Sequence, residues 1–320
     1  MKIYVLVLDE VFDTGLSTLL DTFSIANELA GMGSDPSCKF DVQLVAVRKR
    51  VRTSHGLTVP AMAAAGLPRP DVVLVPAMGA KMPDQVRAAL QRKEVADFGQ
   101  VLQHWADEGA LLAAACTGTF VLAQAGLLAG YAATTSWWLA PLFRELFPAV
   151  KLDDAHMLVN SGNRVTAGAA LGHLDLALWL VRSVSPALAA MTARYLVIEP
   201  RPSQAAFVIP DHLAHADPVV ERFEQWARGK LAQGFSLSEA ASATGASERT
   251  LARRLHAVLG KTPLSYFQDL RVEKAVHLLQ TSTASIDQIA EQVGYADGVT
   301  LRTLLRKKIG RGVRELRSRQ

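Results

Sequence analysis

One cysteine, Cys116, stands in a setting that could activate its thiol. The residues before it, Leu111–Ala115, are all apolar and predict a buried strand, and a helix is expected to begin at Thr117. A strand, a turn that carries a nucleophile and a helix together form the layout of a nucleophile elbow. Backbone N–H groups at a helix N-terminus favour a thiolate, so the thiol of Cys116 could act as a nucleophile. Two other roles are open as well. Cys116 could be the wall of a ligand pocket, which we prefer, or a small packed residue.

A second constellation lies in the last hundred residues, where the sequence repeats itself. Ser236–Ala241 matches Ser285–Ala290 at an offset of 49 residues. Each segment opens with Ser followed three residues later by Glu or Gln, the signature of a capping box at a helix start. Each short helix should stop at a glycine, Gly245 or Gly294, and a second helix should follow. The predicted second helices are Ser247–Leu259 and Asp297–Ile309.

Both second helices carry basic side chains on the face that the apolar pattern leaves exposed. Two short helices joined by a tight turn form a helix-turn-helix unit, whose second helix can enter the major groove of DNA. For one unit alone, a helical bundle with a solvated charged face is the simpler interpretation, but two matched units favour DNA binding. The predicted DNA-contacting residues offer guanidinium, ammonium and hydroxyl groups to phosphates and base edges: Arg249, Thr250, Arg253, Arg254, Thr300, Arg302, Thr303, Arg306 and Lys307.

The Cys116 segment and the C-terminal repeat are predicted to lie in two domains of different architecture. The first half alternates short apolar runs with helical patterns, which predicts an α/β flavodoxin-like sandwich with a mostly parallel sheet. The last hundred residues show helical periods only, which predicts an all-α domain whose two helix-turn-helix units are joined by an amphipathic helix over Pro263–Gln280. Several prolines interrupt the pattern between them. The predicted division is a sensing domain over 1–198, a linker over 199–216 and a DNA-binding domain over 217–320.

The individual elements of the first domain follow from the same patterns. Strands are expected over 3–8, 41–47, 71–75 and 111–115, with a hairpin over 157–166. Helices are expected over 17–30, 84–106 and 117–126, and a further helix from about Ala167.

The charges are divided unevenly along the chain. The net charge is +4, yet residues 217–320 hold 17 Lys and Arg against 11 Asp and Glu, while the rest holds 17 against 19. The basic surplus is therefore C-terminal, as expected for a segment that binds DNA. Two cysteines form no disulfide framework and fit a reducing compartment.

The apolar stretches do not indicate export or a membrane span. The first apolar run, Ile3–Leu8, is too short for a secretory signal. The uncharged stretch Ala110–Phe143 is broken by threonines and glycines, which favours a buried strand, turn and helix. A P-loop, a dinucleotide-binding glycine pattern and paired Cys/His zinc spacing are lacking. We therefore expect a cytoplasmic protein without cofactor, metal or membrane.

The C-terminal segment resembles the DNA-binding domain of AraC-type regulators. The resemblance rests on three motifs and covers about Asp217–Arg317; the motifs are Thr250-Leu251-Ala252-Arg253-Arg254-Leu255, Gly260-Lys261-Thr262-Pro263 and Gly294-Tyr295-Ala296-Asp297. Leu301 and Leu305 stand where the family usually has Phe, and Val313 where it usually has Pro. These departures change packing, and DNA contact is still expected.

The segment around Cys116 resembles the PfpI-like, class I amidotransferase-like superfamily over about Met1–Leu196. With the AraC-type domain, the whole chain is similar to GlxA-type transcription regulators. A catalytic member would need a base beside the thiol, and Ser136 stands where the family can have that His. The superfamily's acidic partner is also missing near Gly15. The resemblance therefore implies a catalytically degenerate domain, with Cys116 only a vestigial nucleophile and the protein not an enzyme.

The resemblance and the strand ends together predict an effector pocket. In open α/β sheets ligands bind beyond the carboxyl ends of the strands. The residues expected there are Asp13, Thr14, Met78, Gly79, Cys116, Thr117, Ser136 and Trp137.

These observations predict a DNA-binding transcription regulator that responds to a small metabolite, and an activator by family resemblance. The partners expected are double-stranded promoter DNA, the effector, a second copy in a homodimer and, as a candidate, RNA polymerase. The alternative is a cysteine-dependent hydrolase or amidase with an appended DNA-binding domain.

Overall fold

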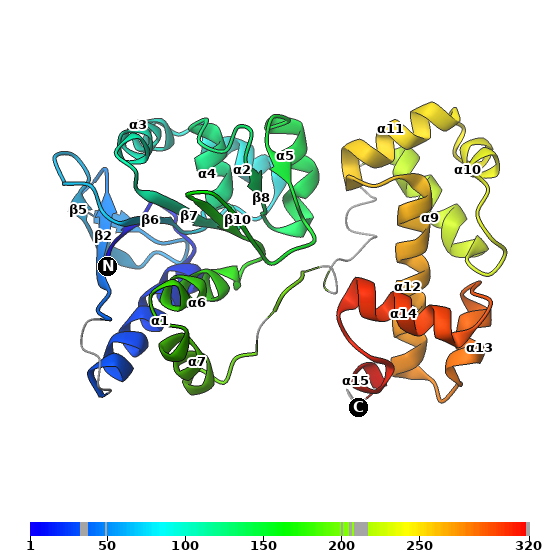
Figure 1. Cartoon of the computed structure of the whole chain (residues 1–320). Helices are drawn as coiled ribbons and strands as arrows, with labels where there is room; N and C mark the ends of the chain where they lie inside the picture. Colours follow the sequence, from blue (N-terminus) through cyan, green and yellow to red (C-terminus); the bar gives the residue numbers. More distant parts are fainter. Residues whose placement is uncertain (33–37, 49, 200, 205–206, 208–216, 318–320) are drawn as a thin grey trace. The chain divides into compact units, whose positions relative to one another are not determined.

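The structure is a computed structural model that describes residues 1–32, 38–48, 50–199, 201–204, 207 and 217–317. The contacts divide the chain into two compact units, Met1–Gln204 and Ala205–Gln320 (Figure 1). Most of the predicted linker, residues 200, 205–206 and 208–216, lies outside the described residues, while 201–204 belong to the first unit. No helix in the described ranges is long and apolar enough to cross a membrane.

The first unit is built on a seven-stranded sheet with the strand order β10-β11-β7-β6-β1-β2-β5. Neighbouring strands are parallel except β10 and β11, which form the predicted antiparallel hairpin. The central strands are apolar throughout because both faces of the sheet are covered. The strands are β1 (Lys2–Leu6), β2 (Asp41–Ala46), β5 (Met62–Ala63), β6 (Val72–Val75), β7 (Leu111–Ala115), β10 (Leu158–Ser161) and β11 (Arg164–Ala167).

Helices cover both faces of this sheet (Figure 1). On one face lie α1 (Asp13–Met32), α6 (Gly172–Val184) and α7 (Pro186–Tyr195), which pack on one another. On the other lie α2 (Pro83–Leu90), α3 (Lys93–Asp107), α4 (Gly118–Gln124) and α5 (Ala140–Leu146). The predicted flavodoxin-like sandwich is confirmed.

Three predicted helices of the first unit had wrong bounds. The helix expected over 17–30 is α1, which begins four residues earlier, at Asp13. The single helix expected over 84–106 is two helices, α2 and α3, separated at residues 91–92. The helix expected from Ala167 begins at Gly172, because Ala167 is still paired in β11. The short elements β3 (Arg50–Arg52), β4 (Thr58–Pro60), β8 (Ala132–Ala133), β9 (Lys151–Leu152) and the 3-10 helix η1 (Trp137–Leu139) were not predicted.

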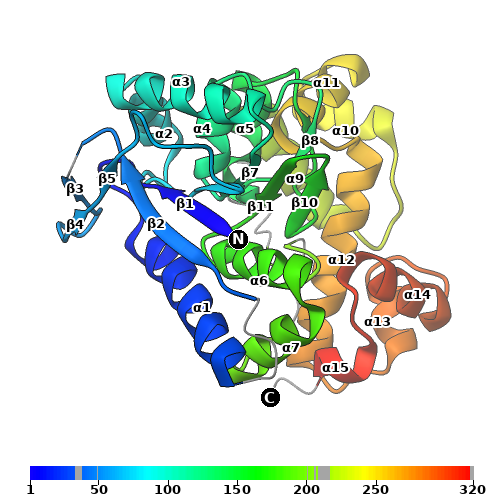
Figure 2. The ribbon, with the colours of Figure 1, turned by 60° about the vertical axis from the view of Figure 1, so that its left-hand side comes forward.

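The second unit is helical in its described residues, as predicted, and is organised by one long helix, α12 (Figure 2). Helices α9, α10 and α11 pack at one end of α12, and α13, α14 and α15 pack at the other. The helices are α9 (Pro218–Lys230), α10 (Leu237–Thr244), α11 (Glu248–Leu259), α12 (Pro263–Thr281), α13 (Ile286–Gln292), α14 (Gly298–Ile309) and α15 (Val313–Arg317).

The helix starts of the repeat follow the predicted capping chemistry. At Ser285 both halves of the capping box form, since its hydroxyl accepts from the Gln288 N–H and the Gln288 side chain accepts from the Ser285 N–H. At Ser236 the structure gives the first half, the bond from the Glu239 N–H to the Ser236 hydroxyl at 3.4 Å. The pairs α10–α11 and α13–α14 are therefore two capped helix-turn-helix units.

Candidate functional site

We call the second helices of the two helix-turn-helix units, α11 and α14, the recognition helices. Each has one apolar and one basic face. In α11, Leu251, Leu255 and Leu259 are buried, and in α14, Leu301 and Leu305 are fully buried. The two α14 leucines fill the core of the second helix-turn-helix unit, so the departure from the family's Phe is a packing change. Of the predicted DNA-contacting residues, Thr250 is half-buried and all the others are exposed.

The threonines of the two helices are engaged in ordering the helix starts. The Thr250 N–H donates to the Ser247 hydroxyl at 3.2 Å, and the Thr300 N–H donates to the Asp297 carboxylate at 2.7 Å. The Thr303 hydroxyl donates to the Val299 carbonyl one turn earlier, at 3.0 Å. These bonds fix the first turn of each helix, the part that reaches base edges when such a helix docks in the major groove.

Arg254, one of the predicted DNA-contacting residues, is held in an ion pair. Its guanidinium lies 3.1 Å from the carboxylate of Asp217, and that carboxylate also caps the start of α9. The Arg254 side chain is 49% exposed, so a part of it still faces solvent. The pair fastens α11 to α9.

Two side chains of α12 join the two helix-turn-helix units. Asp269 pairs with Lys261, which follows α11, at 2.8 Å, and also with Lys308 near the end of α14. Arg271 donates to the Leu231 carbonyl after α9 at 2.8 Å, and its guanidinium lies over the ring of Tyr295, 5.3 Å from the centroid.

The turn between α13 and α14 depends on this contact. Gly294 has φ +79°, and a Cβ there would overlap the Leu231 carbonyl oxygen and lie 2.9 Å from Cζ of Arg271. Through these contacts α12 fixes the positions of the two recognition helices relative to each other, which we call their register. The long helix was predicted from its periodicity, whereas these connecting side chains were not predicted.

The Cys116 elbow has the predicted geometry. Cys116 follows β7 with φ +55°, a conformation rare outside glycine, and α4 begins two residues later. Its N–H donates to the Ala167 carbonyl at 2.8 Å, and its Sγ lies 2.8 Å from the hydroxyl of Ser136. Cys116 is 5% exposed and Ser136 is fully buried, so the thiol is closed off from solvent.

The burial of Cys116 opposes the effect of the helix N-terminus on its thiol. Burial raises the pKa of the Cys116 thiol above its ordinary value and outweighs the hydrogen bonds from Ser136 and Thr117, which lower it. The thiolate is therefore disfavoured at neutral pH. Of the three roles left open for Cys116, the raised pKa disfavours the nucleophile.

The remaining predicted pocket residues fall into two groups. Beside Cys116, the Thr117 hydroxyl donates to the Met78 carbonyl at 3.0 Å, and Trp137 follows Ser136; Thr117, Met78 and Trp137 are all buried. The second group surrounds Ser54: its hydroxyl donates to the Asp13 carboxylate at 2.7 Å, and a Cβ on Gly79 would lie 2.6 Å from the Ser54 Cβ. Thr14 is exposed at the start of α1.

The Asp13 carboxylate is hydrogen-bonded to the loop that contains Ser54 and His55. Burial raises the pKa of Asp13, but hydrogen bonds from Thr53, Ser54 and His55 outweigh burial and hold the pKa well below its usual range. The carboxylate is thus ionised and hydrogen-bonded to Ser54 and His55.

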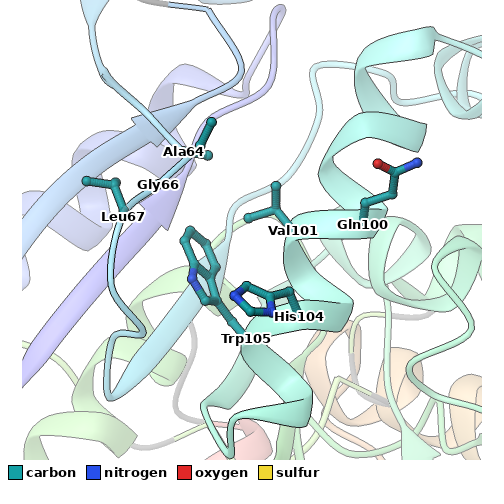
Figure 3. A pocket seen from close by; sticks show the side chains of 8 residues that line it. Ala64, Gly66, Leu67, Gln100, Val101, His104 and Trp105 are labelled. Atoms are coloured by element: carbon teal, nitrogen blue, oxygen red, sulfur yellow. The ribbon is translucent and has the colours of Figure 1, made fainter.

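A surface hollow of about 410 Å³ lies elsewhere on the first unit, between the 64–67 loop and α3. Figure 3 shows Trp105 of α3 pointing toward the loop that carries Gly66 and Leu67, with His104 beside it. The residues that line this hollow include none of the predicted pocket residues. In the part of the chain that the structure describes, no group of three or more His, Cys, Asp and Glu is placed to hold a metal ion.

His173 is a structural histidine. It is fully buried; Nε2 accepts from the Ala77 N–H at 3.0 Å, and Nδ1 lies 2.7 Å from the Ala170 carbonyl. Its ring also fills the space beside Gly15, where a Cβ would lie 2.5 Å from Nε2. Both ring nitrogens of His173 are therefore hydrogen-bonded to backbone groups.

The neutral form of His173 is expected to make the first unit sensitive to acid. Burial lowers the pKa of His173 to about 4 from 6.5 and outweighs the hydrogen bond to Ala170, which raises it. The pKa of His173 is lower in the folded than in the unfolded state. The contribution of its neutral form to the free energy of unfolding is therefore complete above pH 6.5 and is lost as the pH falls toward 4. The loss should reach about 3 kcal/mol.

The measurement compares urea unfolding of the first unit in wild type and His173→Gln from pH 8 to pH 4. The advantage of wild type should shrink below pH 6.5, the usual value of the imidazole. A difference that stays constant with pH would show that this imidazole does not carry the sensitivity.

The comparisons with known proteins agree with both units. Residues 1–183 match the DJ-1/PfpI family, and residues 240–319 match a helix-turn-helix domain. The chain is 29% identical over 227 residues to the HTH-type transcriptional regulator ArgR of Pseudomonas aeruginosa, covering 70% of this chain and 69% of ArgR. It is 28% identical over 211 residues to the regulator GbdR of the same species, covering 64% of this chain and 57% of GbdR.

A solved structure shows the same fold at low identity. It is an AraC family transcriptional regulator from Pseudomonas putida, 21% identical with a TM-score of 0.51, and the match covers 61% of this chain and 98% of that chain. The chain therefore belongs to the DJ-1/PfpI family through its first unit and carries an AraC-type helix-turn-helix domain, the combination of a transcription regulator.

Proposed function

We propose that this chain binds promoter DNA with both recognition helices and activates transcription in response to a small effector held by its first unit. The observation that carries the proposal is the pair of basic helices, α11 and α14, held in one register by Asp269 and Arg271 of α12. Two helices that present arginines on exposed faces match the way helix-turn-helix units read successive major grooves.

In this proposal the nine exposed or half-exposed residues predicted from the sequence contact the DNA, residues 1–198 form the sensing domain and residues 217–320 form the DNA-binding domain. Arg253 and Arg306 lie on the exposed faces of α11 and α14 and are assigned to base edges. Arg254 is assigned to the phosphate backbone, because its pair with Asp217 limits its reach. The protein acts in the cytoplasm as a homodimer.

Replacing Arg253 or Arg306 with Ala is expected to weaken specific DNA binding by about 1–3 kcal/mol each, which is roughly 5- to 150-fold in Kd. The physical reason is the loss of paired hydrogen bonds to a base. Kd is measured by fluorescence anisotropy on a retained promoter fragment and on unrelated DNA at several salt concentrations.

Arg69→Ala and Arg182→Ala serve as controls, since both residues are exposed and belong to the first unit. They remove the same charge and should leave Kd within about twofold. An unchanged Kd for both Arg253→Ala and Arg306→Ala would show that the recognition faces are assigned wrongly.

We propose further that the first unit senses a ligand and catalyses no reaction. Support comes from Cys116, whose thiol is buried against Ser136, and from His173 and Asp13, which are bound to other partners. The relatives that the chain resembles are named transcriptional regulators.

Cys116 should therefore react with iodoacetamide at pH 7 at least about tenfold more slowly than free cysteine, because burial disfavours the thiolate. Mass spectrometry of the labelled Cys116 peptide gives the rate, and Cys116→Ser supplies the blank. A rate above that of free cysteine would restore the hydrolase alternative.

A further inference from the structure

The side chain of Gln204 is fully buried in the first unit although Gln204 is the last residue of that unit. It lies in the segment that the sequence analysis assigned to the linker. A buried carboxamide is costly unless its donors and acceptor are bonded, so its surroundings show what the site selects.

Both ends of the Gln204 carboxamide are bonded. Its Nε2 lies 2.9 Å from the Thr135 carbonyl, 3.2 Å from the Thr134 hydroxyl and 3.4 Å from the His156 carbonyl. Its Oε1 accepts from the Trp137 N–H at 3.2 Å. Two carbonyls at one end and an N–H at the other match a primary carboxamide and repel a carboxylate, which has no donor.

The site is also shaped to this group. A Cβ on Gly168 would lie 2.8 Å from Cδ and Oε1 of Gln204, so this glycine leaves the space that the carboxamide occupies. A larger residue at position 168 would close the site.

The same residues form the Cys116 elbow. The Thr135 hydroxyl donates to the Cys116 carbonyl at 2.8 Å, and Ser136, between Thr135 and Trp137, contacts the Cys116 thiol. Residues 134–137 therefore contact both the Gln204 carboxamide and the Cys116 elbow, which belongs to the predicted effector site.

The backbone before Gln204 is fastened as well. The Met157 N–H donates to the Pro202 carbonyl at 3.1 Å, and the Gln204 N–H donates to the Ala155 carbonyl at 3.0 Å. The residues after Gln204 lead in sequence to α9, the first helix of the DNA-binding unit. Gln204 is therefore the point at which the first unit holds the connection to the second.

We propose that Gln204 is an internal ligand of a carboxamide-binding site, and that an effector carrying a primary carboxamide acts by displacing it. The inference rests on the proposed function, since it identifies the effector class and the residue that transmits its binding. Displacement removes the most deeply buried of the side-chain anchors of segment 201–204, beside those of Arg201 and Ser203, and this changes how the DNA-binding unit is tethered. An effector that binds only the displaced state shifts the equilibrium toward that state.

The test is chemical replacement of the missing group in the full-length chain. Gln204→Ala keeps Cβ and removes an acetamide-shaped group, so acetamide is the probe and acetate the matched control. Hydrogen exchange of the Trp137 amide reports the site directly, because that N–H donates to Gln204 in wild type. Gln204→Met, which keeps the length without the hydrogen bonds, is the second variant if Gln204→Ala unfolds.

In Gln204→Ala the Trp137 amide should exchange about tenfold faster than in wild type. Acetamide should restore protection and acetate should not. Ser203→Ala, which removes the Ser203 hydroxyl bond to the Ala155 carbonyl in the same segment, should leave the Trp137 amide protected. Unchanged exchange in both Gln204 variants, or equal effects of acetamide and acetate, would overturn the site.

Coupling to DNA is measured separately. Gln204→Ala without acetamide should change Kd for a retained promoter fragment at least about fivefold, in the direction in which acetamide changes Kd of wild type. An altered Trp137 amide with an unchanged Kd would overturn the transmission through Gln204. If wild type binds no DNA, the proposed function fails, and the exchange experiment still decides the carboxamide site.

Discussion

Gly294→Ala is expected to abolish specific DNA binding and to destabilise the second unit by about 3 kcal/mol or more. Two costs combine at this residue. At φ +79° an alanine has a conformational strain of about 1–2 kcal/mol, and its Cβ would overlap the backbone carbonyl of Leu231. Because a backbone oxygen cannot rotate away, α13 and α14 must move relative to α9, and Arg271 must leave its place over Tyr295. The recognition helices then lose their common register.

The measurement combines hydrogen exchange over α12–α14 with Kd for a retained promoter fragment. Gly245→Ala is the matched control, since Gly245 ends α10 in the first helix-turn-helix unit with φ +67° and has nothing within 4 Å of an added Cβ. It should cost only the conformational term of about 1–2 kcal/mol and leave Kd nearly unchanged. Equal effects of the two substitutions would show that the contact with Leu231 and Arg271 does not set the register.

Gly118→Ala is expected to destabilise the first unit by about 3–5 kcal/mol. Gly118 is the first residue of α4, and a Cβ there would overlap the Val75 carbonyl oxygen and lie 2.7 Å from the Pro76 carbonyl oxygen. Its ordinary φ removes strain as a cause, so the effect measures the close approach of α4 to β6. The helix would be pushed away from the sheet and carry the Cys116 elbow with it.

The change in the free energy of unfolding of the first unit is measured by thermal unfolding. Hydrogen exchange of the backbone amides of β6 and β7 then shows whether the loss is at these strands. Gly99→Ala is the control, because Gly99 lies within α3 and an added Cβ would make an ordinary contact of 3.5 Å with Ala125. It should stabilise the helix slightly, by about 0.5–1 kcal/mol. A loss below about 1 kcal/mol in Gly118→Ala would mean that α4 and β6 are not packed as tightly as described.

The features that periodicity and local chemistry determine were predicted from the sequence. The runs at β1, β6 and β7 are apolar because both faces of a parallel sheet are covered, and this signal lies within each strand. The helix-turn-helix units were predictable because caps such as Ser285 and the apolar faces of α11 and α14 repeat along the chain. Strands of two or three residues, such as β5, carry no such period.

The features that were missed depend on contacts between distant residues. Gln204 is bonded to residues 134–137 and 156, about 50 to 70 positions away, so a Pro-rich neighbourhood suggested only a linker. The Cys116 thiol illustrates the same point, since the local elbow favours a thiolate while burial by the whole unit disfavours it. Arg271 could be placed on α12 from the sequence, but its contact with Tyr295 could not.

Sequencing the genomic fragments retained by the purified full-length protein tests the central claim most directly. The comparison is between wild type, the double variant Arg253→Ala/Arg306→Ala, and the charge-matched double variant Arg69→Ala/Arg182→Ala in the first unit. Wild type and the first-unit variant are expected to retain the same few promoter fragments, and the recognition-helix variant is expected to retain none of them. Retention of the same fragments by all three proteins, or of none by wild type across candidate carboxamides, would contradict sequence-specific binding through α11 and α14.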